Sequence, residues 1–243
     1  YLVMNIFYSI LSNLSLVLLG YILGSFNTSI ILSKTLKKQD IRNFNSHNAG
    51  ATNTLRTFGK KFALIVFLID VFKTLIPIII LSALFNHVEA ISTFSSKYFL
   101  SPQSIGLGVV IGHIFPIFYN FKGGKGVACS LGFILANNIL FLLIAFVIFM
   151  SIVGVTKFVS LGSILTSSIL IIFFWVPWFI SGILGYWFNN VDMTNKFLDL
   201  SDHWYVSSII YTIISVLVVI SHHKNIVKLI NKTENKLSFN KIK

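Results

Sequence analysis

Long, uninterrupted apolar stretches constrain the fold of this chain more than any other feature of its sequence. Those at residues 7–33, 62–85, 127–154 and 159–188 are each long enough to cross the hydrocarbon layer as a helix, which takes about 20 residues. Their apolar residues run continuously instead of alternating, which argues against a strand barrel. Only 11% of all residues are charged, whereas a soluble domain carries about 25%. The chain is therefore predicted to be an all-α, polytopic integral membrane protein with one domain over residues 1–243.

The basic residues are segregated along the chain. Seven lysines and arginines face one acidic residue between positions 34 and 61, two lysines lie in the loop at 120–126, and six follow His222. These three segments hold 15 of the 19 basic residues, whereas the loop at 189–204 is net acidic. Such a distribution is the positive-inside bias of membrane proteins, and anionic headgroups reinforce it. The net charge of +12 thus indicates topology and anionic ligands, and nucleic acid is not an expected partner.

The three basic segments are expected on the cytoplasmic side of the membrane. No lysine or arginine precedes Lys34, so the first apolar stretch lacks the charged region of a signal peptide and is predicted to be a retained span. This arrangement places the N-terminus outside the cell and the C-terminus in the cytoplasm.

The number of crossings constrains the second half of the chain. Three full crossings after the second basic segment would leave the lysine-rich tail outside, against its charge. The stretch 127–154 is therefore predicted to fold back near Asn137 and Asn138 as two short helices of about 10–16 residues, which protein contacts can bury. With the shorter apolar stretches at 104–119 and 205–221, seven transmembrane helical elements result, and Ser160 and Ser163 return to the cytoplasmic side.

The first basic segment also concentrates small polar side chains. Residues 40–56 contain several Asn, Ser and Thr residues, a glycine that permits a tight turn, and the arginines Arg42 and Arg56. The segment could be a solvated loop whose side chains cap the following helix. It could equally bind phosphate, because the planar fork of arginine suits bidentate contacts to phosphate oxygens.

The second basic segment places Lys122 and Lys125 among Gly123, Gly124 and Gly126, directly before an apolar run. Glycines let backbone amides approach a ligand closely, and the start of a helix offers unpaired N–H groups. A Walker A loop is excluded, because glycine follows Lys125 where serine or threonine is required. The pattern favours an anion site, and the alternative is a flexible turn whose lysines only set topology.

Asp70 and Lys73 lie inside the second apolar stretch, three residues apart and so on one helical face. Charges within a span are costly, so the two residues are expected to pair or to face a polar cavity. His222 and Asn225 have the same spacing at the start of the tail. Histidine there could orient or deprotonate a hydroxyl. No ligand set at zinc spacing is present, and no metal or cofactor is predicted.

The ordered series of motifs resembles the bacterial acyl-phosphate:glycerol-3-phosphate acyltransferases, the PlsY family, over nearly the whole chain. A single glycine-rich motif would be weak evidence, whereas the series is specific. It comprises Gly20-Tyr-Ile-Leu-Gly24-Ser25, Asp40-Ile-Arg42, Asn48-Ala-Gly50-Ala-Thr-Asn53 with Arg56, Asp70…Lys73, Gly112-His-Ile-Phe-Pro116, Phe121-Lys-Gly-Gly-Lys-Gly-Val-Ala128, Val159-Ser-Leu-Gly-Ser163 and His222-x-x-Asn225-Ile-x-Lys228-Leu…Glu234.

The resemblance implies a seven-helix enzyme of the bacterial cytoplasmic membrane with its active site facing the cytoplasm. It would transfer a fatty acyl group from acyl phosphate to the 1-hydroxyl of sn-glycerol 3-phosphate, giving lysophosphatidic acid and inorganic phosphate. Membrane lipids surround it, and no cofactor or obligate protein partner is implied. A transporter of an organic phosphate is the alternative. Transporters need access from both faces and usually contain a repeat, whereas here the polar motifs gather on one side.

The resemblance also assigns residues to the site. Arg56 and Lys125 would neutralise substrate phosphates, and His222 would position the attacking hydroxyl or bind phosphate. The implied catalytic residues are Ser46, Arg56, Lys125, Ser160, His222 and Asn225, and the implied substrate-binding residues are Asn48, Thr52, Asn53, Lys122, Gly123, Gly124, Gly126, Ser163 and Glu234.

The chain departs from the family pattern at four positions. Asn45 and His47 stand where the family usually has glycine, and Lys232 replaces the glycine before Thr233. Asparagine and histidine adopt left-handed backbone conformations more readily than most residues. Lys228 replaces an arginine, which keeps a charge but loses bidentate geometry.

Overall fold

The computed structural model describes residues 2–181 and 203–237, and within these it contains helices and no strand. The prediction of an all-α fold is thereby confirmed. In chain order the elements are α1 (Leu2–Ser25), α2 (Thr28–Lys37), η1 (Ile41–Asn43), α3 (Ala51–Phe58), α4 (Lys60–His87), α5 (Glu89–Lys97), α6 (Gln103–Ile114), η2 (Ile117–Tyr119), α7 (Val127–Asn137), α8 (Ile139–Thr156), α9 (Val159–Phe174), α10 (Pro177–Ser181), α11 (Tyr205–Ser221) and α12 (His223–Ile230).

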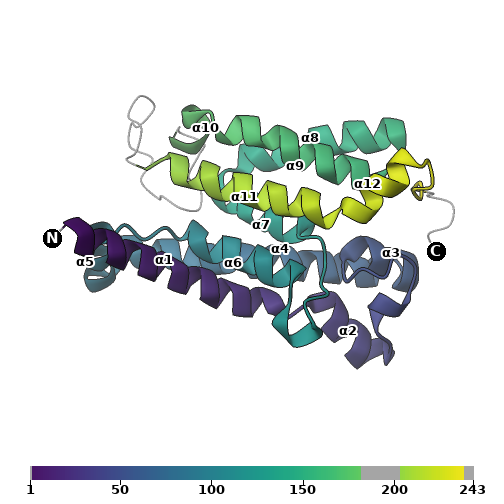
Figure 1. Ribbon diagram of the computed structural model, residues 1–243, viewed down its shortest axis with the longest axis horizontal. Coiled ribbons are helices and arrows are strands. Elements are labelled where there is room, and N and C mark those ends of the chain that lie inside the picture. The colour runs from purple at the N-terminus through teal and green to yellow at the C-terminus, as the bar shows by residue number, and fades with distance from the viewer. Residues whose placement is uncertain (1, 182–202, 238–243) are drawn as a thin grey trace.

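The long helices run side by side along one axis of an elongated bundle (Figure 1). In that view α8, α9 and α11 form one side and α1, α4 and α6 the other, while α7 lies between them and contacts α4, α6, α8 and α11. The short helices α2, α3 and α12 gather at one end of the bundle, opposite the start of α1. The segments that hold most of the basic residues therefore share one end of the molecule.

Three stretches are long and apolar enough to span a membrane, namely residues 3–37, α4 and α8. The α11–α12 pair passes the same test only when it is taken together, across a bend of 55°. The predicted span at 205–221 matches α11. The predicted first span is not one continuous helix, because α1 stops and α2 restarts after Asn27, whose side-chain oxygen accepts from the backbone N–H of Ile30 at 3.2 Å. That capping bond begins a new helix inside the apolar run.

The predicted break in the stretch 127–154 is present. Helix α7 ends at Asn137, and Asn138 caps α8 by accepting from the backbone N–H of Leu140 at 2.7 Å. α7 has 11 residues, within the predicted range, but α8 has 18 and is long enough to span by itself. No helix-breaking residue interrupts α8 before Lys157, whose φ of 64° ends it. The acidic loop predicted at 189–204 lies outside the described residues except for its last two positions.

Helices α1 and α6 approach each other along a seam of four glycines. Gly20 and Gly24 on α1 face α6, and Gly108 and Gly112 on α6 face α1. A Cβ atom at any of the four would lie 2.0–2.1 Å from a backbone carbonyl oxygen of the other helix. Both pairs have the four-residue spacing that lets membrane helices pack backbone to backbone. The seam fixes α6, and with it the glycine–lysine loop that follows α6.

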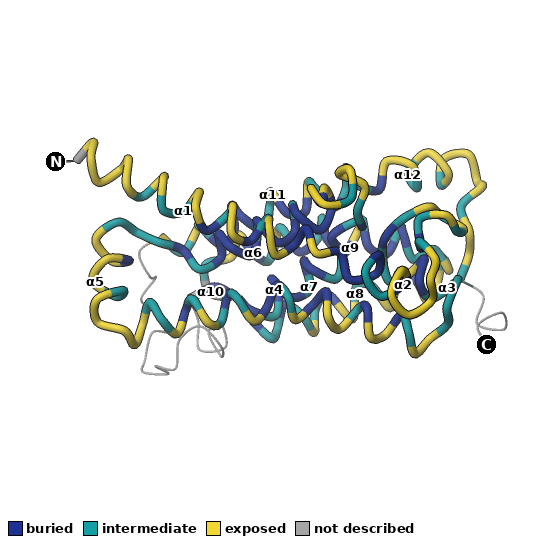
Figure 2. Tube along the Cα trace, turned by 90° about the horizontal axis from the view of Figure 1, so that it is seen from below, coloured by how far each residue is buried: buried dark blue, intermediate teal, exposed yellow. Residues whose placement is uncertain are grey.

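Buried residues concentrate where α6, α7, α9 and α11 meet, whereas α5, α12 and the first turns of α1 are largely exposed (Figure 2). The centre of this core is an aromatic stack in which Phe174 lies between Phe141 and Tyr211, with ring centroids 4.1 Å and 4.0 Å apart. Tyr211 of this stack also lines the cavity described next.

Candidate active site

A cavity of about 410 Å³ lies among α3, α4, α7, α8, α9 and the junction of α11 with α12. Its walls bring together segments that are up to 188 positions apart in the chain, from Ser46 to Glu234. All six residues predicted to be catalytic line this cavity, and so do six of the nine predicted to bind substrate. The twelve are Ser46, Asn48, Thr52, Asn53, Arg56, Lys125, Gly126, Ser160, Ser163, His222, Asn225 and Glu234. Lys122, Gly123 and Gly124 do not line it.

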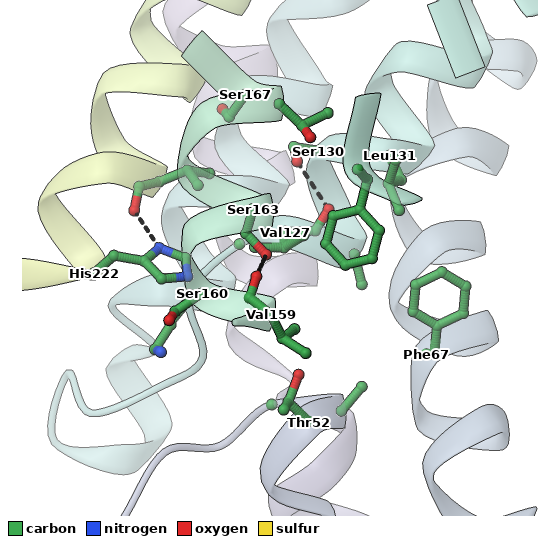
Figure 3. Close-up of a pocket in the computed structure, with 18 of the residues that line it drawn as sticks. Thr52, Phe67, Val127, Ser130, Leu131, Val159, Ser160, Ser163, Ser167 and His222 are labelled. Atoms are coloured by element: carbon green, nitrogen blue, oxygen red, sulfur yellow. Dashed lines mark hydrogen bonds between the residues drawn. The ribbon is translucent and has the colours of Figure 1, made fainter. Parts of the chain in front are cut away.

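The cavity has a polar part and an apolar part. Figure 3 shows Ser160, Ser163 and Ser167 following one face of α9 along it, with His222 close to Ser160. Phe67 of α4 lies on the other side, and a large part of the remaining wall is apolar: Leu131, Ile134, Leu142, Ala145, Phe146, Phe149, Met150 and Leu170. The arrangement suits a molecule with an anionic head and a long apolar portion.

Lys125 is held at the polar end by a chain of side-chain hydrogen bonds. Its Nζ donates to Oδ1 of Asn225 at 2.5 Å, and Nδ2 of Asn225 donates to both carboxylate oxygens of Glu234, at 3.0 and 3.1 Å. Burial lowers the pKa of Lys125 to about 8; Glu234 opposes this shift, while the positive charges of Arg56 and Lys228 add to it. An anion bound there would meet a concentrated positive field that few carboxylates neutralise.

His222 ends α11 and is almost fully buried. Its Nδ1–H donates to the carbonyl oxygen of Val218 at 2.7 Å, which leaves Nε2 as the acceptor nitrogen (Figure 3). Burial, together with the charge of Lys125, lowers the pKa of His222 to about 4, so the imidazole is neutral at neutral pH. A neutral, oriented imidazole can accept a hydrogen bond from a substrate hydroxyl.

Three buried polar atoms on the cavity wall have no hydrogen-bond partner within the described residues. They are the hydroxyl oxygens of Ser160 and Thr166 and Oδ2 of Asp70. Because buried polar groups are nearly always paired, atoms of this kind on one cavity mark positions that can contact a polar ligand. Sequence reasoning had selected Ser160 but not Thr166, which only the packing of α9 against the cavity reveals.

The first polar loop is organised around Asn53. Its side-chain oxygen accepts from the backbone N–H of Ser46 at 3.2 Å, and its amide lies 3.0 Å from the carbonyl oxygens of Phe44 and Asn48. Asn45 and His47 have φ values of 47° and 56°, as their family position suggests. Asn53 therefore shapes the loop that presents Ser46 to the cavity.

The two arginines of this loop differ in their surroundings. Arg42 pairs with Asp40 at 2.8 Å and donates to the carbonyl oxygen of Tyr119 at 3.0 Å, so it joins the two polar loops. Its hydrogen bonds hold the pKa of Asp40 well below the usual range. Arg56, on the last turn of α3, is exposed and lines the cavity. Of the two arginines, only Arg56 lines the cavity.

Gly123 and Gly124 were expected to direct their amides at substrate phosphates, and the structure engages those amides elsewhere. The N–H of Gly123 donates to the carbonyl oxygen of Ile114 at 3.1 Å, and that of Gly124 to the carbonyl oxygen of His113 at 3.0 Å. Both positions need glycine because a Cβ would lie 2.0 Å from an atom of His113. Gly126, with a φ of 79°, does line the cavity.

The expected pair of Asp70 and Lys73 is present, with Nζ 2.7 Å from Oδ1. Asp70 and His113 also line the cavity, so the pair is both structural and part of the polar wall. Donor atoms of Asp70, His113 and Cys129 lie within 4.8 Å of one another. Lys73 already occupies the place of a cation there, because its ammonium group contacts Asp70 and His113 directly.

The apolar helical bundle, with cations and a buried histidine at the polar end of its cavity, is that of a helical integral membrane protein. The glycerol-3-phosphate acyltransferase family model matches residues 14–232. The chain belongs to the glycerol-3-phosphate acyltransferase family, and the resemblance seen in its motifs is confirmed.

Individual relatives agree with this assignment. The chain is 59% identical to a glycerol-3-phosphate acyltransferase of Mycoplasmopsis agalactiae, over 98% of this chain and 99% of the relative. It is 41% identical to that of Mycoplasmopsis synoviae, over 98% and 100%. The crystal structure of PlsY, an integral membrane glycerol 3-phosphate acyltransferase in its glycerol 3-phosphate form, is similar with a TM-score of 0.71 at 30% identity, covering 95% of this chain and 98% of that one. A lysophosphatidic acid form of the same enzyme gives a TM-score of 0.68 at 28% identity, with the same coverage.

Proposed function

We propose that this chain transfers a fatty acyl group from acyl phosphate to the 1-hydroxyl of sn-glycerol 3-phosphate, giving lysophosphatidic acid and inorganic phosphate. One observation carries the proposal: a single cavity joins a cationic, hydroxyl-rich end to a long apolar wall. The two PlsY crystal forms, one with glycerol 3-phosphate and one with lysophosphatidic acid, support this acceptor and this product.

The cationic end accounts for two phosphate-bearing reactants in one place. Two anions repel each other unless positive charges lie beside them, and in a poorly solvated cavity this attraction is strong. Arg56 and Lys125 both line the cavity, and Lys228 is close enough to affect the pKa of Lys125. We assign Arg56 and Lys125 to the substrate phosphates, with Asn48, Thr52 and Gly126 beside them.

The apolar wall accounts for the acyl chain. Phe146 and Met150 of α8 line the cavity and are 61% and 49% exposed. We infer that the cavity opens sideways through α8, which carries further exposed apolar residues. An acyl chain can lie in this opening and remain in contact with lipid, while glycerol 3-phosphate approaches from water at the polar end.

The chemistry follows from the reactive donor and the state of His222. The 1-hydroxyl attacks the acyl carbonyl carbon, a new C–O bond forms, and the C–O bond to phosphate breaks with its electron pair leaving on phosphate. His222, neutral and oriented by Val218, accepts the hydrogen bond of the attacking hydroxyl. Its low pKa makes it a weak base, so the proton passes to the departing phosphate. Ser46, Ser160 and Asn225 hydrogen-bond the reacting groups.

The same proposal covers topology and organisation. It places seven helical elements in the bacterial cytoplasmic membrane, with the N-terminus outside and the polar end of the bundle in the cytoplasm, as a single domain that needs no cofactor or obligate partner. The shorter apolar helices α6, α7 and α9 supplement the three clear spans. Labelling a Lys157→Cys variant from each side of sealed vesicles tests this orientation, because the native Cys129 is buried. Labelling from the outside would reject it.

The decisive assay uses purified protein in lipid vesicles. We expect phosphate release from acyl phosphate only when glycerol 3-phosphate is present, together with lysophosphatidic acid detected by mass spectrometry. Uptake of glycerol 3-phosphate into the vesicles without acylated product would favour the transporter. Acylation with a thioester donor but not with acyl phosphate would refute the proposed donor.

A further inference from the structure

A buried charge network lies between α2, α4 and α6, beneath the glycine–lysine loop. Oδ1 of Asp70 accepts from the hydroxyl of Thr28 at 2.8 Å and from Nζ of Lys73 at 2.7 Å. The same Nζ lies 3.0 Å from Nδ1 of His113. Nδ1 of His113 also lies 3.6 Å from Oδ1 of Asp70, so the three side chains contact one another. Asp70 and His113 are 1% and 3% exposed.

His113 connects this network to the loop. Its ring lies directly against Gly124, where a Cβ atom would lie 2.0 Å from Nε2 and 2.8 Å from Cε1. Its carbonyl oxygen accepts from the N–H of Gly124 at 3.0 Å, so ring and backbone hold the same residue. The next residue is Lys125, whose ammonium group faces the cavity. The side chain of His113 thus fixes the position of the backbone at Gly124, directly before Lys125.

The other loop is tied to the same point. The N–H of Ala49 donates to the carbonyl oxygen of Gly123 at 3.3 Å, and the carbonyl oxygen of Ala49 would lie 2.8 Å from a Cβ on Gly124. Asn27, beside Thr28, places its amide 3.5 Å from that carbonyl oxygen. The polar loop that carries Ser46 and the loop that carries Lys125 therefore meet above the ring of His113.

We propose that Asp70, Lys73 and His113 form a positioning network that holds the glycine–lysine loop, and with it Lys125, in the geometry that binds a substrate phosphate. Asp70 fixes Lys73, Lys73 fixes the ring of His113, and the ring supports Gly124. The three residues act through Lys125 and are not themselves catalytic. The inference rests on the proposed function, because it assigns the network to phosphate binding in that reaction.

Stability alone is a weak explanation for this network. Charges at membrane depth are costly and mark functional positions. A buried ion pair often stabilises a protein no more than well-packed apolar residues of similar size. The second carboxylate oxygen of Asp70 has no partner within the described part of the chain, although it is buried on the cavity wall. An unpaired buried oxygen of this kind lowers stability.

The test removes both charges together, so that neither remains unpaired. Asp70→Asn alone leaves Lys73 without a counter-charge and should lower the thermal midpoint. The double variant Asp70→Asn/Lys73→Met should recover most of that loss. Thr74→Val is the matched control, because Thr74 is buried on the same helix and its hydroxyl contacts only the backbone oxygen of Asp70 among the described residues, at 3.5 Å.

We expect the double variant to raise KM for one or both phosphate substrates by about tenfold or more, the effect of weakening one charge-assisted hydrogen bond, with kcat changed far less. Calorimetry with inorganic phosphate should show a matching loss of affinity. Thr74→Val should have wild-type KM values. A stably folded double variant with wild-type KM values and phosphate affinity would overturn the proposal.

A second variant covers the case in which the double variant does not fold. His113→Asn keeps an oxygen that can accept from Lys73 but withdraws the ring from Gly124. It should also raise KM, whereas His113→Gln, whose amide extends farther toward Gly124, should restore part of the loss. Equal, wild-type KM values in both would overturn the proposal. Wild-type protein in the same assay separates this proposal from the proposed function. If the wild type forms no lysophosphatidic acid, the proposed function is refuted, and not the positioning network alone.

Discussion

The ammonium group of Lys125 lies 2.5 Å from the side-chain oxygen of Asn225, although the two residues are 100 positions apart in the chain. Lys125 precedes α7, and Asn225 lies in the first turn of α12. Asn225 also donates to Glu234, which lies beyond the end of that helix. The contact therefore closes one end of the cavity by joining the middle of the chain to its tail.

Removing either cation of the cavity should largely abolish acyl transfer. Lys125→Ala and Arg56→Ala each delete a charge-assisted contact to phosphate, and we expect kcat/KM to fall by about 100-fold or more in each case. Initial rates of lysophosphatidic acid formation measure this. Lys61→Ala is the control, because Lys61 is exposed at the start of α4 and does not line the cavity. Near-normal activity in both test variants would refute the phosphate contact.

The pH dependence should report the depressed pKa of Lys125. Only the protonated amine attracts an anion, and its pKa in the free protein is about 8. We therefore expect kcat/KM to be highest below that pH and to decline as pH rises through it, since this parameter follows groups of the free enzyme. In Lys125→Arg the guanidinium stays charged, so the decline should move to higher pH. If kcat/KM declined over the same pH range in that variant, the decline would belong to another ionisable group.

His222 should remain neutral throughout the physiological range. Its pKa is about 4, so on acidification it gains a proton only well below the pH at which an ordinary histidine does. Nitrogen-15 NMR of histidine-labelled protein can follow the titration, and the His222→Asn variant identifies the resonance by its loss. We expect Nδ1 to be the protonated nitrogen at pH 7, because it donates to Val218. Titration of this resonance near pH 6.5 would contradict the buried environment.

The glycine seam should tolerate no side chain. In Gly108→Ala, the new Cβ would lie 2.0 Å from the carbonyl oxygen of Val17, so α1 and α6 must separate. We expect a loss of about 1–3 kcal/mol in stability, measured as a lower thermal midpoint in detergent. Gly154→Ala is the matched control in α8, where a Cβ meets nothing within 4 Å. Equal effects of the two substitutions would show that helix propensity, rather than close approach, governs the seam.

Lys232 should be replaceable by glycine with a gain in stability. It follows α12 with a φ of 56°, and the N–H of Thr233 donates to the carbonyl oxygen of Lys228 at 2.8 Å, which is the hydrogen bond of a Schellman cap. Glycine takes this conformation without strain, so Lys232→Gly should stabilise the protein by up to about 1 kcal/mol. Lys232→Ala removes the same charge but keeps the strain. If alanine stabilises as much as glycine, the gain comes from charge.

The helical fold could be predicted because apolar length and charge segregation act over many residues. The break at Asn138 could be predicted for that reason, because the positively charged tail was expected on the same side as the other basic segments. The break at Asn27 was not, because one asparagine in an apolar run does not reveal that its oxygen caps the next helix. The length of α8 was also underestimated, since the position of a break does not fix the length of the helix after it.

The candidate site was predictable in its members but less so in their contacts. Polar residues in three basic segments indicated one anion site, and twelve of the fifteen predicted site residues line a single cavity. The glycines of the loop were misjudged in one respect. A glycine at position 124 indicates that another atom approaches the backbone closely, but it does not show whether that atom belongs to a ligand or to the protein. In this structure it belongs to the ring of His113. His113 was given no role at this loop, because the packing that brings its ring to Gly124 has no counterpart in the spacing of residues along the chain.

The lateral opening at Phe146 and Met150 has a consequence for how the reaction ends. Both side chains line the cavity and are exposed, so in the proposed reaction the acylated product would leave sideways into the bilayer once its phosphate is released from Arg56 and Lys125. No step in that path passes through water. Turnover should then respond to the fluidity of the surrounding lipid, and the membrane itself becomes the product reservoir.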